Sequence, residues 1–383
     1  MEHMALYRKY RTKTFDEIVG QTHIVRSLKN QIKSDAISHA YLFCGTRGTG
    51  KTSIARIFAR AINCEHPVDG SPCGKCHTCQ VLSSPNSMDI IEIDAASNNR
   101  VDEIRDINDK VKYPPVDGKY KVYIIDEVHM LTDSAFNALL KTLEEPPKHV
   151  VFILATTDVQ KLPATILSRL MRFDFKLISK DDLVKHLEHV FTDSGVKYEK
   201  EALDMIATLG EGSVRDTLSI ADMCIAYTDG NVTYSSVVEA LGTIDKSSLY
   251  DISANILNHD GAELLGKIDS LCAKGKSIIQ ITKDLVTYFR DLAVVKTCKD
   301  YDKILKYPSD VLEQMQSAVK NIDVHDIINI LVKLSSLEGE YRATTSPRAI
   351  FEITLMDIVY GTSSDVNNRL DNIEKQLKNM VSP

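Results

Sequence analysis

The stretch "HAYLFCGTRGTGKTSIARIFARAI", residues 39–62, decides the fold because it joins a β-rich run to a glycine-rich loop and then to a helical pattern. Its "GTRGTGKT" at residues 45–52 matches the pattern G-x-x-x-x-G-K-[ST]. The string alone could be a plain glycine turn, but a preceding strand and a following helix are the context of a loop that binds phosphates with its backbone N–H groups. We expect Lys51 to reach the β and γ oxygens of a nucleotide and Thr52 to hold magnesium. The residues predicted to contact the nucleotide here are Gly45, Thr46, Arg47, Gly48, Thr49, Gly50, Lys51, Thr52 and Ser53.

Short β-rich runs alternate with helical patterns through the first half of the chain. The predicted strands are residues 39–44, 88–93, 121–126, 150–156 and 171–176. The middle runs are almost wholly apolar, as is typical of strands buried on both faces. The pattern therefore predicts an α/β domain with a parallel five-stranded sheet covered by helices on both sides.

An acidic pair follows the third of these strands. The run "VYIIDE" places Asp126 and Glu127 at the carboxyl edge of the sheet, where ligands bind in open α/β folds. We expect Asp126 to support magnesium and Glu127 to orient and polarise an attacking water molecule. The alternative is a chance acidic pair at a strand end. Thr157, at the next strand end, could bond a γ-phosphate or that water, or could be only a β-former and turn residue.

Two arginines stand where a ligand could meet them. Arg215 in "GSVRDTLS" falls in the first turn of a predicted helix, where the helix dipole disfavours a cation. It either faces a ligand or forms a salt bridge with Asp216 or Glu211. Arg169 in "ILSRLMRF" either stabilises phosphoryl-transfer charge at a neighbouring subunit or lies on the surface without a role.

Four cysteines lie close together after the phosphate loop, with the spacing C-x8-C-x2-C-x2-C. Four thiolates suit a tetrahedral zinc ion, and four protein ligands leave no open position for catalysis. Disulfides and an iron–sulfur cluster are the alternatives, although the next position expected for a cluster ligand is Ser83. His66 and His77 are expected to be exposed loop residues. The predicted zinc ligands are Cys64, Cys73, Cys76 and Cys79.

The chain of 383 residues is long enough for two or three domains of roughly 100 to 200 residues each. After the strands end, helical periodicity takes over, with a capping box at Ser179 and Asp182 and helices expected at residues 179–195, 200–210 and 212–227. The predicted domains are a core at 1–178 with a zinc insertion at 64–79, a small helical domain at 179–242, an all-helical domain at 243–362 and a tail at 363–383.

The tail carries an apolar stripe over two heptads, too short for a convincing coiled coil. We expect it to dock on a neighbour or to lead toward a further segment. The stripe is Val366, Leu370, Ile373, Leu377 and Met380.

Composition limits the environment and the partners. With 46 basic and 53 acidic side chains, the net charge of −7 should repel nucleic acid, so any DNA contact needs a local basic patch. No apolar run approaches the roughly 20 residues that span a bilayer, and the first residues do not read as a secretory signal. We expect a cytoplasmic protein with no membrane contact.

These motifs, in this order, resemble the gamma/tau family of bacterial DNA polymerase III clamp-loader subunits, a group of AAA+ ATPases. The resemblance covers about residues 5–245 strongly and the remaining helices more loosely. It rests on "HAYLFCGTRGTGKTSIARIFARAINC", "IEIDAAS", "YIIDEVHMLTDSAFNALLKTLEEPP", "LATTDVQKLPATILSR" and "EGSVRDTLS".

The resemblance implies a role for each motif. Residues 45–52 are similar to Walker A, Asp126 and Glu127 to Walker B, Thr157 to sensor 1 and Arg215 to sensor 2. Arg169 resembles the arginine finger that acts in trans, although Leu170 follows it where the family has cysteine. The segment "YRKYRTKTFDEIVGQ" resembles the one that surrounds adenine and ribose in this family. The resemblance therefore implies that adenine and ribose are contacted by Tyr7, Arg8, Arg11 and Val19.

The resemblance also implies ATP, Mg2+ and Zn2+ as ligands and a five-membered ring with delta and delta-prime type subunits, held by a helical collar. ATP binding would open a sliding clamp for primer-template DNA, and hydrolysis would release it; the chain itself would not polymerise. Arg100 and Arg105 are the DNA contacts expected, and a longer form would reach polymerase and helicase in the nucleoid-associated cytoplasm. The rival functions are a non-hydrolysing scaffold subunit and a zinc-dependent nucleic-acid-binding or redox module.

Overall fold

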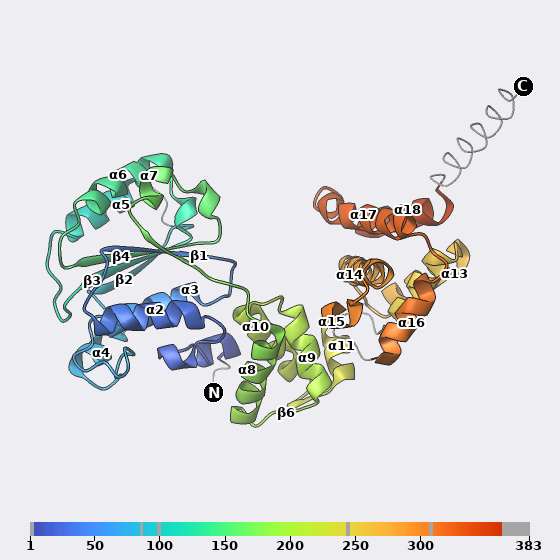
Figure 1. Cartoon of the computed structure of the whole chain (residues 1–383), viewed down its shortest axis with the longest axis horizontal. Coiled ribbons are helices and arrows are strands. Elements are labelled where there is room, and N and C mark those ends of the chain that lie inside the picture. The colour runs from blue at the N-terminus through green and yellow to red at the C-terminus, as the bar shows by residue number, and fades with distance from the viewer. Residues whose placement is uncertain (1–3, 85–86, 98–100, 243–245, 306–308, 362–383) are drawn as a thin grey trace, which may run out of the picture. The chain divides into compact units, whose positions relative to one another are not determined.

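The protein is described by a computed structural model covering residues 4–84, 87–97, 101–242, 246–305 and 309–361 (Figure 1). The chain divides into two compact units, Met1–Val237 and Val238–Pro383. The Arg100 prediction and the apolar stripe of the tail lie outside the described residues.

A parallel five-stranded sheet forms the centre of the first unit, with strand order β2-β3-β4-β1-β5. In register, Leu42 of β1 lies opposite Leu154 of β4, and Ile153 of β4 lies opposite Ile124 of β3. The predicted α/β fold is confirmed. The strands are β1 (Ala40–Cys44), β2 (Ile90–Asp94), β3 (Lys121–Asp126), β4 (Val150–Thr156) and β5 (Met171–Asp174).

Four strand ends differ from the prediction: β1 begins at Ala40 and β2 ends at Asp94, each one residue later than predicted, and two further ends differ by two residues. β2 begins at Ile90 and not at residue 88, because the Ser87 hydroxyl accepts the N–H groups of Asp89 and Ile90 and holds a bend there. β5 ends at Asp174 and not at residue 176, because the Lys176 N–H bonds the side chain of Gln21. In both places a side-chain hydrogen bond competes with the sheet ladder.

Helices cover both faces of the sheet (Figure 1). On one face, α2 (Thr22–Lys33) and α3 (Lys51–Ala61) pack on a core that includes Tyr41, Phe43 and Phe58. On the other, α5 (Val101–Lys110) and α6 (Asp133–Glu144) pack on a core that includes Leu42, Tyr123 and Phe152. The alternation of Tyr41, Leu42 and Phe43 between the two cores follows from the two-residue period of a strand.

A small helical bundle completes the first unit, in α8 (Lys180–Asp193), α9 (Lys200–Leu209) and α10 (Val214–Tyr227). The predicted cap is present, since the Ser179 hydroxyl accepts the Asp182 N–H at 3.2 Å. A short parallel pair that was not predicted, β6 (Lys197–Tyr198) and β7 (Asn231–Val232), joins the loops of this bundle. The helix α11 (Tyr234–Leu241) follows and contains the boundary between the two units.

Every regular element in the described part of the second unit is a helix, as predicted. Its core gathers around α14 and includes Leu285, Phe289, Leu334 and Phe351, each with an exposed fraction of 0%. The helices are α12 (Lys246–Leu257), α13 (Gly261–Ala273), α14 (Ile278–Thr297), α15 (Tyr301–Leu305), α16 (Ser309–Val319), α17 (Val324–Tyr341) and α18 (Pro347–Tyr360).

None of the helices in the described ranges combines the length and the apolar character needed to cross a membrane.

Candidate active site and candidate metal centre

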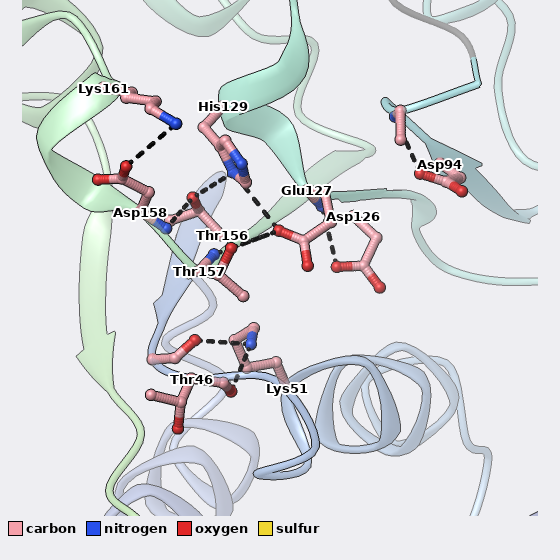
Figure 2. A network of polar contacts seen from close by, with 12 residues as sticks. Thr46, Lys51, Asp94, Asp126, Glu127, His129, Thr156, Thr157, Asp158 and Lys161 are labelled. Carbon is pink, nitrogen blue, oxygen red and sulfur yellow. Dashed lines mark hydrogen bonds and ion pairs between the residues drawn. The ribbon is translucent and has the colours of Figure 1, made fainter. Parts of the chain in front are cut away.

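The glycine-rich loop leaves β1 at Cys44 and enters α3 at Lys51. The Lys51 ammonium folds back into this loop and donates to the carbonyl oxygens of Gly45 at 2.7 Å and Thr46 at 2.8 Å (Figure 2). Thr49 braces the same turn by donating its hydroxyl to the Thr46 carbonyl at 2.9 Å. Burial lowers the pKa of Lys51, while Glu127 and Asp126 oppose that shift. The loop thus keeps a buried cation among backbone groups, the arrangement that a phosphate site needs. Of the other predicted contacts in this segment, Arg47 is exposed and Ser53 is partly buried on α3.

Gly48 is the point at which this loop contacts the helical bundle. Its φ is +76°, and a methyl group added to it would lie 1.9 Å from the Ser213 hydroxyl oxygen. The Gly48 carbonyl accepts the Val214 N–H at 3.1 Å. Only glycine meets both the backbone angle and this close approach to the start of α10.

Thr52 and Asp126 meet across the site. The Thr52 hydroxyl donates to one Asp126 carboxylate oxygen at 2.7 Å, and the other oxygen accepts the Glu127 N–H at 2.9 Å. A hydroxyl and a carboxylate are hard oxygen ligands, and magnesium in nucleotide sites is bound by one or two such groups together with phosphates. The two residues that the sequence assigned to magnesium therefore lie together and fit the ion.

The Glu127 carboxylate is fixed by Thr157 (Figure 2). One oxygen of Glu127, Oε2, accepts the Thr157 hydroxyl at 2.9 Å and the Thr157 N–H at 3.3 Å. Glu127 also has a φ of +47°, which an L-residue with a side chain rarely adopts. Strained residues of this kind cluster at functional sites because the surrounding structure holds them in place.

His129 joins this group and was missed in the sequence. Its Nδ1 lies 3.4 Å from Glu127 Oε2 and shares a hydrogen bond with the Thr156 hydroxyl at 3.0 Å. The Thr156 hydroxyl also accepts the Asp158 N–H at 3.0 Å (Figure 2). The only signal in the sequence was the position of the histidine two residues after the acidic pair.

Gln21 was also missed. Its side chain is fully buried and donates to the carbonyl oxygens of Thr49 at 3.3 Å and Lys176 at 2.7 Å. It thereby ties the phosphate loop to the segment that follows β5. A single glutamine before a helix carries no pattern that distinguishes this role.

Arg215 faces the N-terminal segment. Its guanidinium lies 5.3 Å from the ring centroid of Tyr7, whose ring also lies 5.7 Å from the guanidinium of Arg8. Among the described residues it forms no ion pair with Asp216 or Glu211. An arginine over an aromatic face is a cation–π contact. This contact connects the first turn of α10 to the N-terminal helix α1 (Leu6–Lys9).

Arg11 and Val19 lie farther along the N-terminal segment. Desolvation lowers the pKa of Arg11, as do Arg56 and Arg215, while Glu92 and Asp126 oppose the shift. Arg11 therefore shares the electrostatic field of the acidic edge of the sheet. Val19 is partly buried between the short helix at Phe15–Glu17 and α2.

The structure does not bring Arg169 to the phosphate loop of its own chain. Within the described ranges its guanidinium bonds Glu144 at 2.7 Å, the Ser168 hydroxyl at 3.2 Å and the Thr165 carbonyl. Leu170 packs against the core on the α5 and α6 face. Arg105, the other predicted DNA contact, is exposed and paired with Asp102 at 3.1 Å.

The four cysteines form a compact cluster. Their sulfur atoms all lie within 4.8 Å of one another, with 4.0 Å between Cys64 and Cys76 and 3.9 Å between Cys73 and Cys79. A tetrahedral site with Zn–S bonds of about 2.3 Å places its sulfurs about 3.8 Å apart, whereas a disulfide needs about 2.05 Å. The cluster therefore fits one zinc ion, and all four thiols are free.

Backbone groups support this metal centre. The N–H groups of Lys75 and Cys76 point at the Cys73 sulfur and lower its pKa to about 6. The thiolate is the form that binds metal. Burial raises the pKa of Cys79, so that sulfur needs a cation to remain ionised. His66 and His77 do not belong to the cluster.

The fold and the site together define a class. The class is that of an AAA+ ATPase domain. Its features here are a parallel sheet with the order β2-β3-β4-β1-β5, a phosphate loop after β1, an acidic pair after β3 and a helical lid whose α10 contacts the loop. Family models match three consecutive segments: DNA polymerase III, delta subunit, over residues 20–179; DNA polymerase III clamp loader subunit, ATPase lid domain, over residues 182–230; and DNA polymerase III subunits gamma and tau domain III over residues 232–375. The chain belongs to the gamma/tau family of DNA polymerase III clamp-loader subunits, which confirms the resemblance in its sequence motifs.

Curated relatives support this assignment along nearly the whole chain. The chain is 41% identical over 359 residues to the DNA polymerase III subunit tau of Bacillus subtilis, covering 94% of this chain and 63% of that protein. It is 39% identical over 304 residues to the subunit gamma of Buchnera aphidicola, covering 79% of this chain and 83% of that protein. It is 43% identical over 296 residues to the subunit tau of Escherichia coli, covering 77% of this chain and 46% of that protein. The chain spans less than two thirds of the tau subunits that it matches.

Proposed function

We propose that this chain is an ATP-hydrolysing motor subunit of a DNA polymerase III clamp loader, in which ATP binding and hydrolysis drive the loading of a sliding clamp onto primed DNA. The observation that carries the ATPase is the convergence of Lys51, the Thr52–Asp126 pair and the Thr157–Glu127 pair at one edge of the sheet. The clamp and the primed DNA enter through membership of the family.

Nucleotide binding is assigned to the segments that surround this edge. Residues 45–53 hold the phosphates through backbone N–H groups and Lys51, whose burial strengthens its attraction for them. Tyr7, Arg8, Arg11 and Val19 contact adenine and ribose. Arg215 reaches the phosphates from the lid, so closure of the lid depends on the nucleotide.

Magnesium is assigned to Thr52 and Asp126. When bound, the ion would neutralise charge on the phosphates and so favour transfer of the terminal phosphoryl group to water, with ADP as the leaving group. The hydrogen bond of 2.7 Å between the two residues holds both oxygens on the same side of the loop before the ion binds.

Hydrolysis is assigned to Glu127, with Thr157 as its partner. Thr157 occupies one carboxylate oxygen of Glu127 through two hydrogen bonds. The other oxygen is then the one that can accept a proton from the attacking water. Lys51 stabilises the charge that develops on the γ-phosphoryl oxygens.

Arg169 completes the site of an adjacent subunit in this proposal. An arginine finger supplies its planar fork across an interface, so turnover requires assembly. Its position in the turn after the short helix α7 (Ala164–Leu167), where it bonds Glu144 and not its own phosphate loop, is consistent with action in trans.

The wider organisation is part of the proposal. Residues 1–178 form the ATPase core with a zinc-binding insertion at 64–79, residues 179–242 form the lid, residues 243–362 form an oligomerisation collar, and residues 363–383 form a tail. The partners are delta and delta-prime type subunits in a ring of five, the sliding clamp and a primer-template junction. A longer form would contact polymerase and helicase. The location is the bacterial cytoplasm at the nucleoid.

An ATPase assay tests this function. The turnover of the chain is measured alone, with partner subunits, and with the sliding clamp and primed DNA added in turn. We expect low turnover alone and clear stimulation in the full assembly, with Lys51→Ala as the control that lacks phosphate binding. Turnover that no combination of partners, clamp and DNA increases would contradict the clamp-loader assignment.

A further inference from the structure

The N-terminal strap, residues 4–17, connects the helical lid to the zinc module, residues 64–84. At the lid, α1 packs on α10, and the Tyr10 hydroxyl lies 2.6 Å from both the Asp193 carboxylate and the Ser194 hydroxyl. At the other end, the Phe15 N–H bonds the Ser71 hydroxyl at 3.3 Å. Phe15 and Ser71 are both buried, with exposed fractions of 1% and 4%. The strap is therefore fixed at one end by the lid and at the other by the zinc module.

The zinc module also contacts α2. Asp69 forms ion pairs with Lys29 at 2.9 Å and with Lys33, and Lys29 extends the pairing to Asp16 of the strap. These cations lower the pKa of Asp69 to about 2. Next to it, Gly70 has a φ of +75° and lies so close to α2 that a methyl group there would be 3.1 Å from the Lys29 Cα. Asp69 is charge-paired and Gly70 is in close backbone contact, so the tip of the module has a defined position on the core.

Arg60 forms a third connection. It lies in the last turn of α3, the helix that begins with the phosphate-binding Lys51. Its guanidinium donates to the Lys13 carbonyl of the strap at 2.9 Å and to the Ser83 hydroxyl of the zinc module at 3.4 Å. Cys64, the first predicted zinc ligand, follows only three residues after α3 ends. The module thus contacts both the strap and the helix that carries the phosphate loop.

The tip of the module has almost no regular secondary structure. The residues between Cys64 and Cys76 contain no helix or strand, apart from one isolated pairing of Val68 with Ser71. Closing such a loop costs entropy that its few buried side chains do not offset, and in small metal modules the metal supplies that free energy. Asp69 and Ser71, which hold α2 and the strap, lie inside the loop that the four sulfur atoms close.

We propose that the metal at Cys64, Cys73, Cys76 and Cys79 braces the N-terminal strap and thereby raises the affinity of the chain for adenine nucleotide. This inference rests on the proposed function in assigning Tyr7 and Arg11 of the strap to the nucleotide. The coupling is reciprocal by thermodynamic necessity, so bound nucleotide raises the affinity for the metal by the same factor, through the same strap. The metal has no part in the chemistry of hydrolysis.

Two binding measurements on the full chain test the coupling. ADP affinity is measured by calorimetry for zinc-loaded protein and for protein stripped with a chelator, and circular dichroism confirms that the stripped protein remains folded. Zinc affinity is then measured by competition with a colorimetric chelator, with and without saturating ADP. We expect at least a fivefold loss of ADP affinity on stripping and a gain in zinc affinity by the same factor when ADP is bound, within the usual range of coupling between sites.

Variants at Asp69 test the contact between the zinc module and α2 while keeping the metal ligands. Asp69→Lys leaves all four thiols in place but repels Lys29 and Lys33, so zinc content should stay at one ion per chain while ADP binds at least threefold more weakly. Asp69→Asn keeps the left-handed turn at φ +47°, which asparagine tolerates, and should show a smaller effect in the same direction. Lys75→Gln is the matched control, since this exposed side chain changes the charge of the module without touching α2 or the strap.

The outcomes are distinct. Folded, zinc-free protein that binds ADP as tightly as loaded protein would overturn the inference, as would Asp69→Lys with the affinity of the Lys75→Gln control. If stripping unfolds the protein, or if Asp69→Lys loses zinc, the decision rests on Asp69→Asn and Ser71→Ala, which must weaken ADP binding at full zinc content. Absence of ADP binding by the loaded wild-type chain would instead contradict the proposed nucleotide site.

Discussion

Replacing Glu127 with glutamine tests the chemistry most directly, because the structure predicts how the new amide will point. Thr157 directs both its hydroxyl and its N–H at Oε2 of Glu127, at 2.9 and 3.3 Å. In Glu127→Gln only the amide oxygen can accept these bonds, so it takes that position. The amide nitrogen then stands where the second carboxylate oxygen was. The variant therefore presents a hydrogen-bond donor to the attacking water in place of a base.

The size of the effect follows from this orientation. A positioned general base contributes about 10²- to 10⁴-fold to the rate. Since the amide also offers the wrong polarity, we expect the upper part of that range, a loss of about 10³- to 10⁴-fold. At about 1.36 kcal/mol for each factor of ten, this corresponds to about 4 to 5.5 kcal/mol of transition-state stabilisation.

The assay is single-turnover ATP hydrolysis in the assembly with partner subunits, clamp and primed DNA, alongside ATP affinity. Thr157→Val serves as the matched variant, because it removes the hydroxyl donor while keeping the N–H donor, and should cost about tenfold. If Thr157 acts only by positioning Glu127, the double variant should be no slower than Glu127→Gln alone. A Glu127→Gln enzyme that binds ATP normally and keeps more than a tenth of wild-type turnover would refute the assignment of Glu127. Multiplicative losses in the double variant would refute the positioning role of Thr157.

Three further predictions concern the interface, the phosphate loop and the second unit. Arg169→Ala and Arg169→Lys should each reduce turnover of the assembly by about 10³-fold without changing ATP affinity of the isolated chain, because lysine lacks the planar fork; turnover retained in the lysine variant would contradict this. Gly48→Ala should destabilise the first unit by about 2 to 3 kcal/mol in urea unfolding, from left-handed strain of about 1 to 2 kcal/mol and about 1 kcal/mol for loss of the N-cap of α10, in which the Ser213 hydroxyl accepts the Asp216 N–H. Gly50→Ala, which has the strain but open space around it, should cost only the strain, so equal losses would refute the contact. Phe351→Ala should destabilise the second unit by about 3 to 5 kcal/mol, against less than about 0.5 kcal/mol for the exposed Ile353→Ala.

Local patterns carried most of what could be predicted about the fold. The strands were found because buried parallel strands are continuous apolar runs, and the helix of the phosphate loop because its glycines and lysine have fixed spacing. The start of α8 and the cysteine cluster could be predicted for the same reason, because the residues of a helix cap and of a zinc-binding cysteine motif lie close together in the sequence. The errors were the two-residue strands β6 and β7, which are too short to show a pattern, and strand ends, where Ser87 and Gln21 capture backbone N–H groups.

The rest of the site depends on contacts between distant parts of the chain. Gln21 bonds Lys176, which is 155 residues away, and Arg169 bonds Glu144, which is 25 residues away at the end of α6. Neither the periodicity nor the spacing of residues in the sequence predicts such pairs, because each partner is an ordinary polar residue in its own segment. His129 was closer to detection, but its partners become evident only when β3 and β4 lie side by side in the sheet.

Hydrogen bonds connect the phosphate loop to other elements of the first unit, so we expect a change in the loop on nucleotide binding to be transmitted to those elements. Gly48 accepts a hydrogen bond from the start of α10, and the Thr49 carbonyl accepts one from the buried Gln21. Both contacts are to backbone oxygens of the loop, so they would sense any change in its path. Lys51 donates to the carbonyls of Gly45 and Thr46, and we expect bound phosphates to draw it away and free those two acceptors. Because the interior is close-packed, such a change cannot be absorbed locally. We therefore expect the lid, through α10, to be the first element to respond to ATP, before any contact with clamp or DNA is made.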